Sequence, residues 1–427
     1  MASFDGQDRA YERTERSVTM MSMIKAASRW SVGVVAGLGL LAAGGAEARS
    51  TTNRPASIVV WPKIVVDSSG NWFGVPTDTK LMLSSTNASG IKQAHCFYIN
   101  ATGHCSNDGS PCRDAGDCDV AECVPSWSET DFDVVLTQEQ PLAWYASDGL
   151  SRGQFPIEGP FRCNAPFNNL QCFTDAQCPN NVGCNSGQSN LGSAIPPAPE
   201  DPFIGALVCI QFTGGSNSEP DQTATRNRLY GDATIVRQAP TSVVVDPARY
   251  NAIGLEASGN TVSDGQLVLS DGGNYASCPG VLILSHLFDG AVDPILGNPA
   301  VQYGTELTLV PCSNDFLTQT PGRSVAQFLV FNEFEQRFST SRTVDCLFDS
   351  QLSRIDTRNP ARSIFSAGVA GSLAGQTRIR GVGGSAPLGS GLLGVARANL
   401  TGLTPPSSAA YDLHQMGNGR QDVIVLP

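Results

Sequence analysis

Short runs of β-branched and aromatic residues, each closed by turn formers, recur along most of the sequence. Residues 56–61, 94–99 and 206–212 are clear examples. The 44 Gly and 27 Pro among the 427 residues supply frequent turns between such runs. Runs of this composition favour extended backbone, and no stretch of helical length after residue 48 has a 3.6-residue apolar period. The sequence therefore predicts an all-β fold.

Strand patterns fill both halves of the chain, on either side of a Gln-Ala-Pro-Thr linker near residues 237–241. We expect two tandem immunoglobulin-like β-sandwiches, the first over residues 56–237 and the second over residues 242–427. Strands are expected at 56–61, 64–66, 81–83, 94–99, 132–136, 142–145, 206–212, 233–236, 243–245, 281–284, 307–310, 326–331, 343–348, 368–380, 392–400 and 423–426.

A weak internal repeat favours two sandwiches of related topology. In each half a strand leading to an Asn turn precedes a strand with a cysteine, Cys96 or Cys346. A segment ending in Gln and a Gly-led strand follow in both halves. A repeated order of this kind is typical of duplicated units. Chance similarity among β-rich segments is the alternative.

Thirteen cysteines constrain the loops of this chain, and eight of them fall in two clusters of four. The clusters are predicted as loop insertions at residues 105–123 and 163–184. Neither contains the C-x-x-C spacing of a zinc knuckle or an apolar run, so disulfides are expected to replace the missing core, with metal binding as the alternative. The disulfide candidates in the clusters are Cys105, Cys112, Cys118, Cys123, Cys163, Cys172, Cys178 and Cys184.

The other five cysteines are Cys96, Cys209, Cys278, Cys312 and Cys346. Cys96 and Cys209 lie in alternating apolar runs and form the candidate pair between two strands of one sandwich. Five is an odd number, so at least one thiol is free or pairs between chains, and the full connectivity does not follow from sequence. Disulfides persist in oxidising compartments, so the cysteine content agrees with export.

Residues 1–48 are predicted to be a signal peptide with an upstream segment. Lys25 and Arg29 provide a basic start, residues 31–45 form a small-residue apolar run, and Ala-Glu-Ala at 46–48 fits a cleavage site. An uncleaved anchor is the alternative, but the run is short and Gly-rich for a membrane span. We expect an extracytoplasmic protein (periplasmic, cell-surface or secreted) without a membrane span after cleavage.

With these features the chain resembles a loose group of uncharacterised secreted bacterial proteins with immunoglobulin-like repeats and four-cysteine inserts. The resemblance rests on an Asn-centred turn between strands and a strand ending near Gln. It covers most of residues 56–236 and, weakly, residues 324–427. It implies a sandwich fold and export, and it brings no known activity or functional residues.

The net charge of −12 argues against nucleic-acid or anionic-membrane partners, because binding to either depends on Lys and Arg. Envelope proteins or glycans are the expected partners. Self-association is a further possibility, since the strands at 56–66 and 423–426 are open either to pairing within the chain or to strand addition between chains.

No catalytic, cofactor-binding or metal site is predicted. The four His are His95, His104, His286 and His414, and none has the spacing of an H-E-x-x-H helix. No nucleophile elbow or phosphate-binding Gly loop is present in the sequence. Ser285, His286 and Asp289 are triad residue types, but neighbours in a strand point to opposite faces. No cofactor is expected.

Paired carboxylates are the one candidate for catalysis. Glu129, Asp131 and Asp133 are spaced by two, so they share a face if they lie in a strand. Glu333 and Glu335 form a second such pair. A solvated polar strand face is the simpler interpretation of both sets.

The tryptophans after the leader are all in the first half: Trp61, Trp72, Trp127 and Trp144. They are expected in the core, with a sugar-stacking patch as the alternative. Taken together, these features predict a secreted or cell-envelope protein that is not an enzyme and has a structural, adhesive or assembly role. The alternatives are a glycan-binding module and a carbohydrate-active enzyme.

Overall fold

Strands account for nearly all the regular structure in the computed structural model of this chain, as the sequence predicts. The structure describes residues 50–88, 92–113, 117–118, 121–150, 161–164, 166, 170–172, 178–181, 184–185, 194–212, 226–238, 245–259, 265–383, 388–403 and 407–427. The predicted signal peptide and the linker at 239–241 lie outside the described residues.

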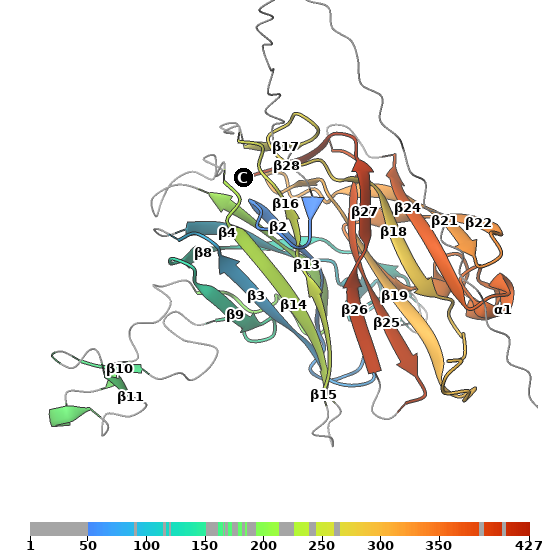
Figure 1. Ribbon diagram of the computed structural model, residues 1–427, viewed down its shortest axis with the longest axis horizontal. Coiled ribbons are helices and arrows are strands. Elements are labelled where there is room, and N and C mark those ends of the chain that lie inside the picture. The colour runs from blue at the N-terminus through green and yellow to red at the C-terminus, as the bar shows by residue number, and fades with distance from the viewer. Residues whose placement is uncertain are drawn as a thin grey trace, which may run out of the picture. The chain divides into compact units, whose positions relative to one another are not determined.

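Two antiparallel sheets carry the first half of the chain (Figure 1). One has the strand order β1-β16-β2-β13-β4-β8, and the other has the order β15-β14-β3-β9. The strands of these sheets are β1 Ser50–Thr51, β2 Ile58–Val66, β3 Thr77–Ser85, β4 Lys92–Asn100, β8 Ser128–Leu136, β9 Pro141–Tyr145, β13 Phe203–Phe212, β14 Leu229–Gln238, β15 Val245–Asn251 and β16 Ile253–Leu255.

The second half contributes two more antiparallel sheets, β22-β21-β24-β18-β27 and β23-β19-β25-β26, and a small sheet β17-β28-β20. A single turn of α-helix, α1 Ala367–Ala370, precedes β24. The strands are β17 Gln266–Leu269, β18 Pro279–Leu287, β19 Gln302–Pro311, β20 Asn314–Asp315, β21 Arg323–Asn332, β22 Arg337–Asp345, β23 Phe348–Gln351, β24 Ala374–Val382, β25 Leu392–Thr401, β26 Ser407–Asp412, β27 His414–Asn418 and β28 Asp422–Val425.

Each predicted cysteine cluster forms a three-stranded sheet of its own. The order is β6-β5-β7 in the first cluster and β11-β10-β12 in the second. The first lies between β4 and β8, and the second lies between β9 and β13, so both are insertions between strands of the larger sheets. Their strands are β5 Gly103–Cys105, β6 Pro111–Cys112, β7 Cys123–Val124, β10 Phe161–Cys163, β11 Gln171–Cys172 and β12 Cys184–Asn185.

Three apolar cores hold the larger sheets together. The first core lies between the two first-half sheets and includes Trp61, Leu81 and Trp144. The third core lies between the two larger second-half sheets, for example around Phe328. The second core joins the halves, because β2, β4 and β13 contribute to it together with β17, β19, β25 and β28. Strand β2 is therefore buried along its whole length.

Strand addition between chains at residues 56–66 and 423–426 stays a prediction, whereas both strands have partners within the chain. Strand β2 pairs with β13 and β16, and β28 pairs with β17 and β20. Pairing within the chain, which was the other alternative, uses both strands. They pair with different partners and not with each other.

The predicted repeat does not describe the topology. The Cys96 strand, β4, lies between β13 and β8, whereas its expected counterpart β22 pairs with β21 alone at a sheet edge. Cys346 follows β22 in a turn with φ 60°, and the expected strands at 343–348 and 368–380 are interrupted by this turn and by α1. The similarity between the halves is therefore local.

Strands after the predicted boundary also complete the first-half sheets. β15 pairs with β14, and β16 pairs with β2. Residues 46–427 cluster as one compact unit. The division into domains at 237–242 stays a prediction.

Candidate functional site

A β-bulge in β2 turns a lysine away from the first core. Pro62 and Lys63 together face the single residue Ala206 of β13, because the register passes from Ile64–Gly205 to Trp61–Leu207. Proline has no N–H to give to the ladder, and within sheets it is typical of bulges. Trp61 and Ile64 both pack in the first core although they are three positions apart in sequence. The bulge makes this possible, because its extra residue restores the alternation of side chains between the two faces of the strand.

Lys63 meets two carboxylates from the second half. Its Nζ lies 3.3 Å from Glu306 Oε2 on β19 and 2.7 Å from Asp349 Oδ1 on β23. The lysine side chain is 2% exposed, and those of Glu306 and Asp349 are 22% and 13% exposed. The Tyr250 hydroxyl of β15 donates to the Lys63 carbonyl and so holds the bulged backbone.

Two arginines extend this arrangement into a network of six charged groups. Arg397 of β25 lies directly opposite Glu306 in the ladder, and its guanidinium is 3.3 Å from Asp246 Oδ2 on β15. Arg237 of β14 is 3.5 Å from Glu306 Oε1. Asp246 also accepts hydrogen bonds from the backbone and hydroxyl of Ser408 on β26, where β15 lies beside β26 (Figure 1).

The network is electrically balanced: Lys63, Arg237 and Arg397 face Asp246, Glu306 and Asp349. Burial alone would raise the pKa of Glu306, but the three nearby cations outweigh it and lower the pKa to about 2. Burial, together with Arg237, lowers the pKa of Arg397 to about 10. Glu306 and Arg397 are thus ions at neutral pH, and the six groups connect the sheets of the two halves.

The predicted carboxylates at 129, 131 and 133 share one face of β8, and His95 of the neighbouring β4 joins them. His95 Nδ1 is 2.8 Å from Asp133 Oδ1, and its Nε2 is 3.6 Å from Asp131 Oδ2. Burial, and then the charge of Asp131, raise the pKa of Glu129 to about 7. The neighbouring His95 and, after it, a hydrogen bond to Gln319 oppose this rise in pKa only in part.

The other acidic pair is placed differently from the prediction. Glu333 and Glu335 lie in the turn between β21 and β22, where Glu335 has φ 61°, and not on one strand face. Glu333 Oε2 accepts hydrogen bonds from the backbone of Leu373 and Ala374. Its role is to fasten this turn to the segment before β24.

His104 and His286 have structural partners, and His414 is exposed on β27. His104 is 3.1 Å from Glu200, and it is not joined to the acidic groups of His95. His286 is buried, bonds to Thr377, and has its pKa lowered to about 4 by burial. Asp289 instead accepts from the backbones of Thr305 and Ser353, so the triad residue types at 285–289 form no triad.

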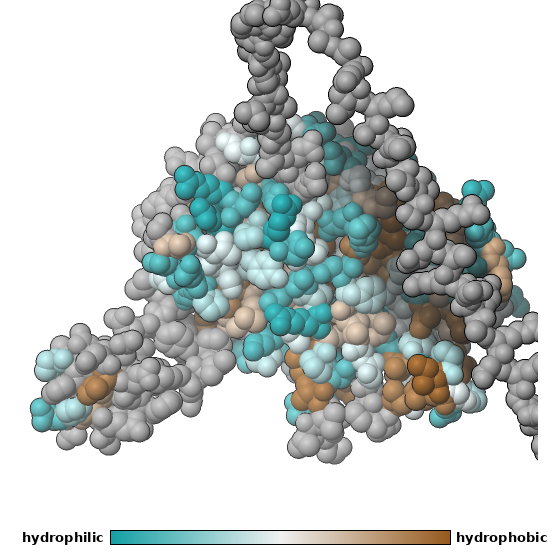
Figure 2. All heavy atoms as spheres, viewed as in Figure 1, coloured by the Kyte–Doolittle hydropathy of each residue, from teal (hydrophilic) through white to brown (hydrophobic). Residues whose placement is uncertain are grey.

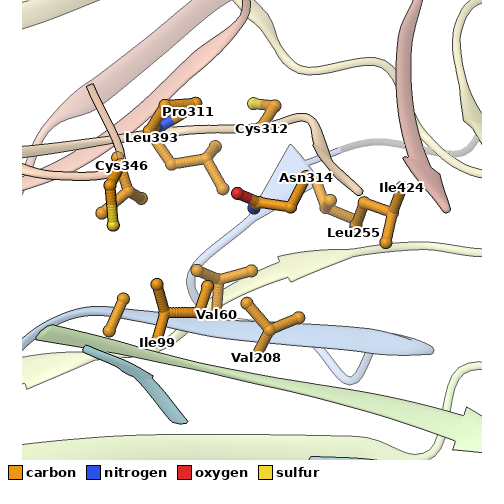
Figure 3. A pocket seen from close by; sticks show the side chains of 12 residues that line it. Val60, Ile99, Val208, Leu255, Pro311, Cys312, Asn314, Cys346, Leu393 and Ile424 are labelled. Carbon is orange, nitrogen blue, oxygen red and sulfur yellow. The ribbon is translucent and has the colours of Figure 1, made fainter. Parts of the chain in front are cut away.

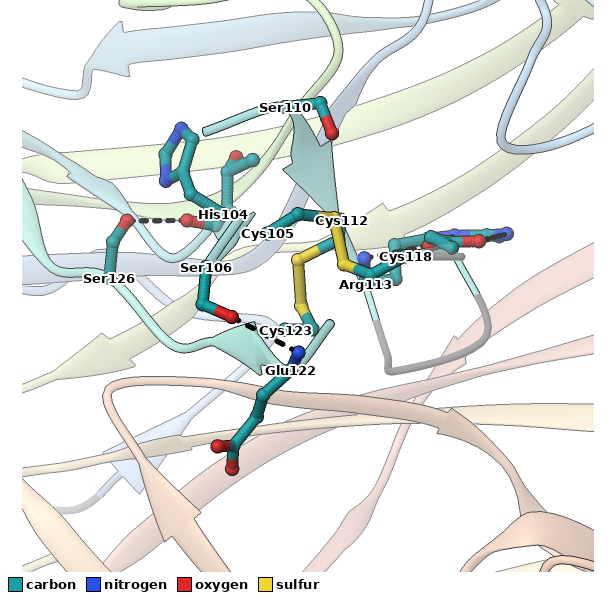
Figure 4. Close-up of a disulfide and its surroundings, with 12 residues drawn as sticks. His104, Cys105, Ser106, Ser110, Cys112, Arg113, Cys118, Glu122, Cys123 and Ser126 are labelled. Carbon is teal, nitrogen blue, oxygen red and sulfur yellow. Dashed lines mark hydrogen bonds and ion pairs between the residues drawn. A yellow bond between two sulfur atoms is a disulfide. The ribbon is translucent and has the colours of Figure 1, made fainter. Parts of the chain in front are cut away.

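Five disulfides are present among the described residues. The first cluster pairs its four cysteines with each other, and the half-cystines themselves make its small core (Figure 4). Cys278–Cys312 is a pair that the sequence did not single out. The five pairs are Cys96–Cys209, Cys105–Cys118, Cys112–Cys123, Cys163–Cys178 and Cys278–Cys312.

Cys346 is the free cysteine among the described residues, and it is buried. It lines a small apolar pocket between the halves, opposite Val60, Ile99 and Val208 (Figure 3). Burial, and then the charge of Asp345, raise the pKa of its thiol. The thiol is therefore protonated and sheltered.

Two described groups bring three metal-binding side chains together, but their cysteines are all in disulfides and offer no thiolate. Trp61 and Trp144 are fully buried, Trp72 is 9% exposed and Trp127 packs against the second core. Trp61, Trp72 and Trp144 are thus buried as expected, and Trp127 is partly buried.

Comparison with known proteins found no matching family model, no similar curated protein and no similar solved structure. The chain is a β-rich, multi-sheet protein with several disulfides, which suggest an oxidising, extracytoplasmic environment. Within its described part, no helix has the length and apolar character needed to cross a membrane.

Proposed function

We propose that this protein is a secreted or cell-envelope structural component, built from two immunoglobulin-like sandwiches and used in adhesion or assembly. The observation that carries the proposal is the balanced network of six charges between the halves. The charged groups of this network pair with one another, which suits a component that keeps a fixed geometry. The disulfides support the same role in an oxidising compartment.

An apolar end of the second half supports assembly with a partner. Strands β18 and β21 both end beside the start of β24, so the loops that follow them lie at the same end. Exposed there are Ile295 (92%), Phe334 (69%), Leu296, Val369 and Leu373. Figure 2 shows brown surface at the lower edge of the second half in this view. Clustered apolar surface of this kind marks interaction sites in soluble proteins.

Cell fractionation combined with the native mass of the mature chain tests this role. A large envelope-bound assembly, unchanged in mass by reductant, is the expected result. A released monomer with no bound partner would count against an assembly role.

Paired variants test the apolar end itself. Ile295→Ser with Phe334→Ser should shift the assembly towards the monomer in size-exclusion chromatography. Leu317→Ser, at another exposed apolar position (59%) on a different turn, is the control and should leave the assembly intact. Equal effects of both changes would argue that general surface polarity, and not this end, controls association.

A carbohydrate-active enzyme is the second candidate, because burial raises the pKa of Glu129 to about 7 on the same strand face as Asp131 and Asp133. A carboxylic acid with a raised pKa next to a second carboxylate is the arrangement used in glycoside hydrolysis. Turnover of envelope polysaccharide that is lost in Asp131→Asn/Asp133→Asn would support it. Unchanged turnover in that double variant would remove it.

A further inference from the structure

The contact between Lys63 and Asp349 places an amine against a carboxyl group inside the protein. The two residues are 286 positions apart in sequence, yet Nζ and Oδ1 are 2.7 Å apart. Both side chains are largely shielded from water, at 2% and 13% exposure. In solution such groups remain a hydrated ion pair, whereas fixed neighbours react with an effective concentration of about 10⁵–10⁸ M.

Two neighbours supply what amide formation requires. Glu306 Oε2 accepts a hydrogen bond from Lys63 Nζ at 3.3 Å and so holds the amine beside the Asp349 carboxyl group. Thr308, which faces Asp349 across the β19–β23 ladder, donates its hydroxyl proton to Asp349 Oδ1. A donor on this oxygen stabilises the charge that develops when the carboxyl carbon is attacked. The pair thus has a positioned amine, a carboxylate in contact with it and an oxyanion donor.

We propose that Lys63 and Asp349 join in an intramolecular amide bond that links the two halves covalently. Lys63 passes a proton to the Asp349 carboxylate across the 2.7 Å contact, and its Nζ attacks the carboxyl carbon. The N–C bond forms, one C–O bond breaks, and that oxygen leaves as water with two protons from the ammonium group. No oxidant, reductant or other reactant is consumed.

The surroundings tolerate this change because the amide removes one positive and one negative charge together. Arg237 and Arg397 then remain opposite Asp246 and Glu306, so the buried network stays balanced. Lys80 on β3 provides a comparison within the same chain, since it is part-buried and lies across the sheet from Tyr145. The inference does not rest on the proposed structural role.

Peptide mapping of the mature protein, after reduction and alkylation of all cysteines, tests the bond directly. Trypsin cleaves after a free lysine but not after one whose amine is acylated. The expected product is a branched peptide with an uncleaved bond after Lys63, joined to the peptide 343–354. Its mass is lower than the sum of the two peptides by one water molecule. Linear peptides ending at Lys63, with no branched product, overturn the proposal.

Variants of single residues test which side chains form the amide bond and which one positions them. Lys63→Arg keeps the charge and cannot form the amide, so the branched peptide should disappear and an unmodified 343–354 peptide should appear. Lys80→Arg, the control, should leave the branched peptide unchanged. Glu306→Gln, which removes the carboxylate that holds the amine, should lower the yield of the branched peptide, and an unchanged yield would overturn the positioning role of Glu306. Because the wild-type map decides the existence of the bond, the proposal does not depend on the folding of any variant.

Discussion

Arg397 shows how much a single buried cation matters in this fold. It is 2% exposed and lies beside the carboxylates of Asp246 and Glu306. Arg397→Met would leave both carboxylates buried without this partner, and breaking a buried pair costs about 3–5 kcal/mol. We expect that loss in the free energy of unfolding, measured by urea denaturation at pH 7.

The exposed pair Arg323–Asp345 is the matched control for this measurement. Surface ion pairs contribute about 0–1 kcal/mol because water screens them. Arg323→Met should therefore change stability little. A similar loss in both variants would show that Arg397 contributes no more to the free energy of unfolding than a surface ion pair does.

The buried His286 predicts that the free energy of unfolding decreases as the pH falls below 6.5. Its pKa is lowered to about 4 by burial, against 6.5 in an unfolded chain, so the folded state favours the neutral ring. This contribution is fully present above pH 6.5 and is lost as the pH falls through 4. The difference corresponds to about 3 kcal/mol. Urea unfolding of His286→Gln should show a smaller loss of stability between pH 6.5 and 4 than the wild type, whereas equal slopes would contradict it.

Cys346 should be unreactive in the native protein. Its thiol is buried and its pKa is raised, and only the thiolate attacks alkylating reagents. Iodoacetamide at pH 8 should leave the Cys346 peptide unmodified unless the protein is first unfolded without reductant. Rapid native labelling would show that the pocket beside Val60 opens in solution.

At the scale of strands, the sequence predicts buried elements better than half-exposed ones. The core-facing runs in β2, β4, β13, β21 and β25 were located because apolar and β-branched residues dominate them. Strands β26 and β27 were missed because most of their residues are exposed or half-buried. Local sequence patterns do not show which strands pair with each other, since β16 pairs with β2 across nearly two hundred residues.

One candidate site was likewise predictable from local sequence, and the other was not. The period of two in a strand is a local rule, so the shared face of Glu129, Asp131 and Asp133 was predictable. The charge network draws single residues from six strands, and no local pattern brings them together. One signal was present: Lys63 follows Pro62 inside an otherwise apolar run, where an unpaired charge is costly.

Gly231 of β14 tests the packing between the first-half sheets. A Cβ at this position would lie 2.2 Å from the Trp61 ring and 2.8 Å from the Met82 carbonyl oxygen. Gly231→Ala should cost about 1–3 kcal/mol, because the rigid indole has to shift. Thermal unfolding measures the loss.

Gly368 in α1 serves as its control, since a Cβ there meets nothing within 4 Å. Gly368→Ala should be neutral or stabilising, because alanine restricts the unfolded chain and suits a helix. If Gly231→Ala were equally harmless, the close approach of β14 to Trp61 would be wrong.

At the scale of the whole molecule, the shared second core predicts that the halves depend on each other. A fragment ending at residue 238 keeps β2, β4 and β13 but loses β15 and β16 from their sheets. It also bares the face of Val60, Phe97 and Val208 that β19, β25 and β28 cover. Lys63 would lose both of its carboxylate partners.

We therefore expect residues 50–427 to unfold in one cooperative calorimetric transition and the fragment 50–238 to show none. A fragment 50–259 separates two causes, since it restores β15 and β16 but leaves the second core uncovered. If burial of that core is decisive, this longer fragment should also lack a transition and should bind a hydrophobic dye. If it instead unfolded cooperatively at the temperature of the whole chain, strand pairing alone would be sufficient, and the first half would be an independent domain whose boundary lies after β16.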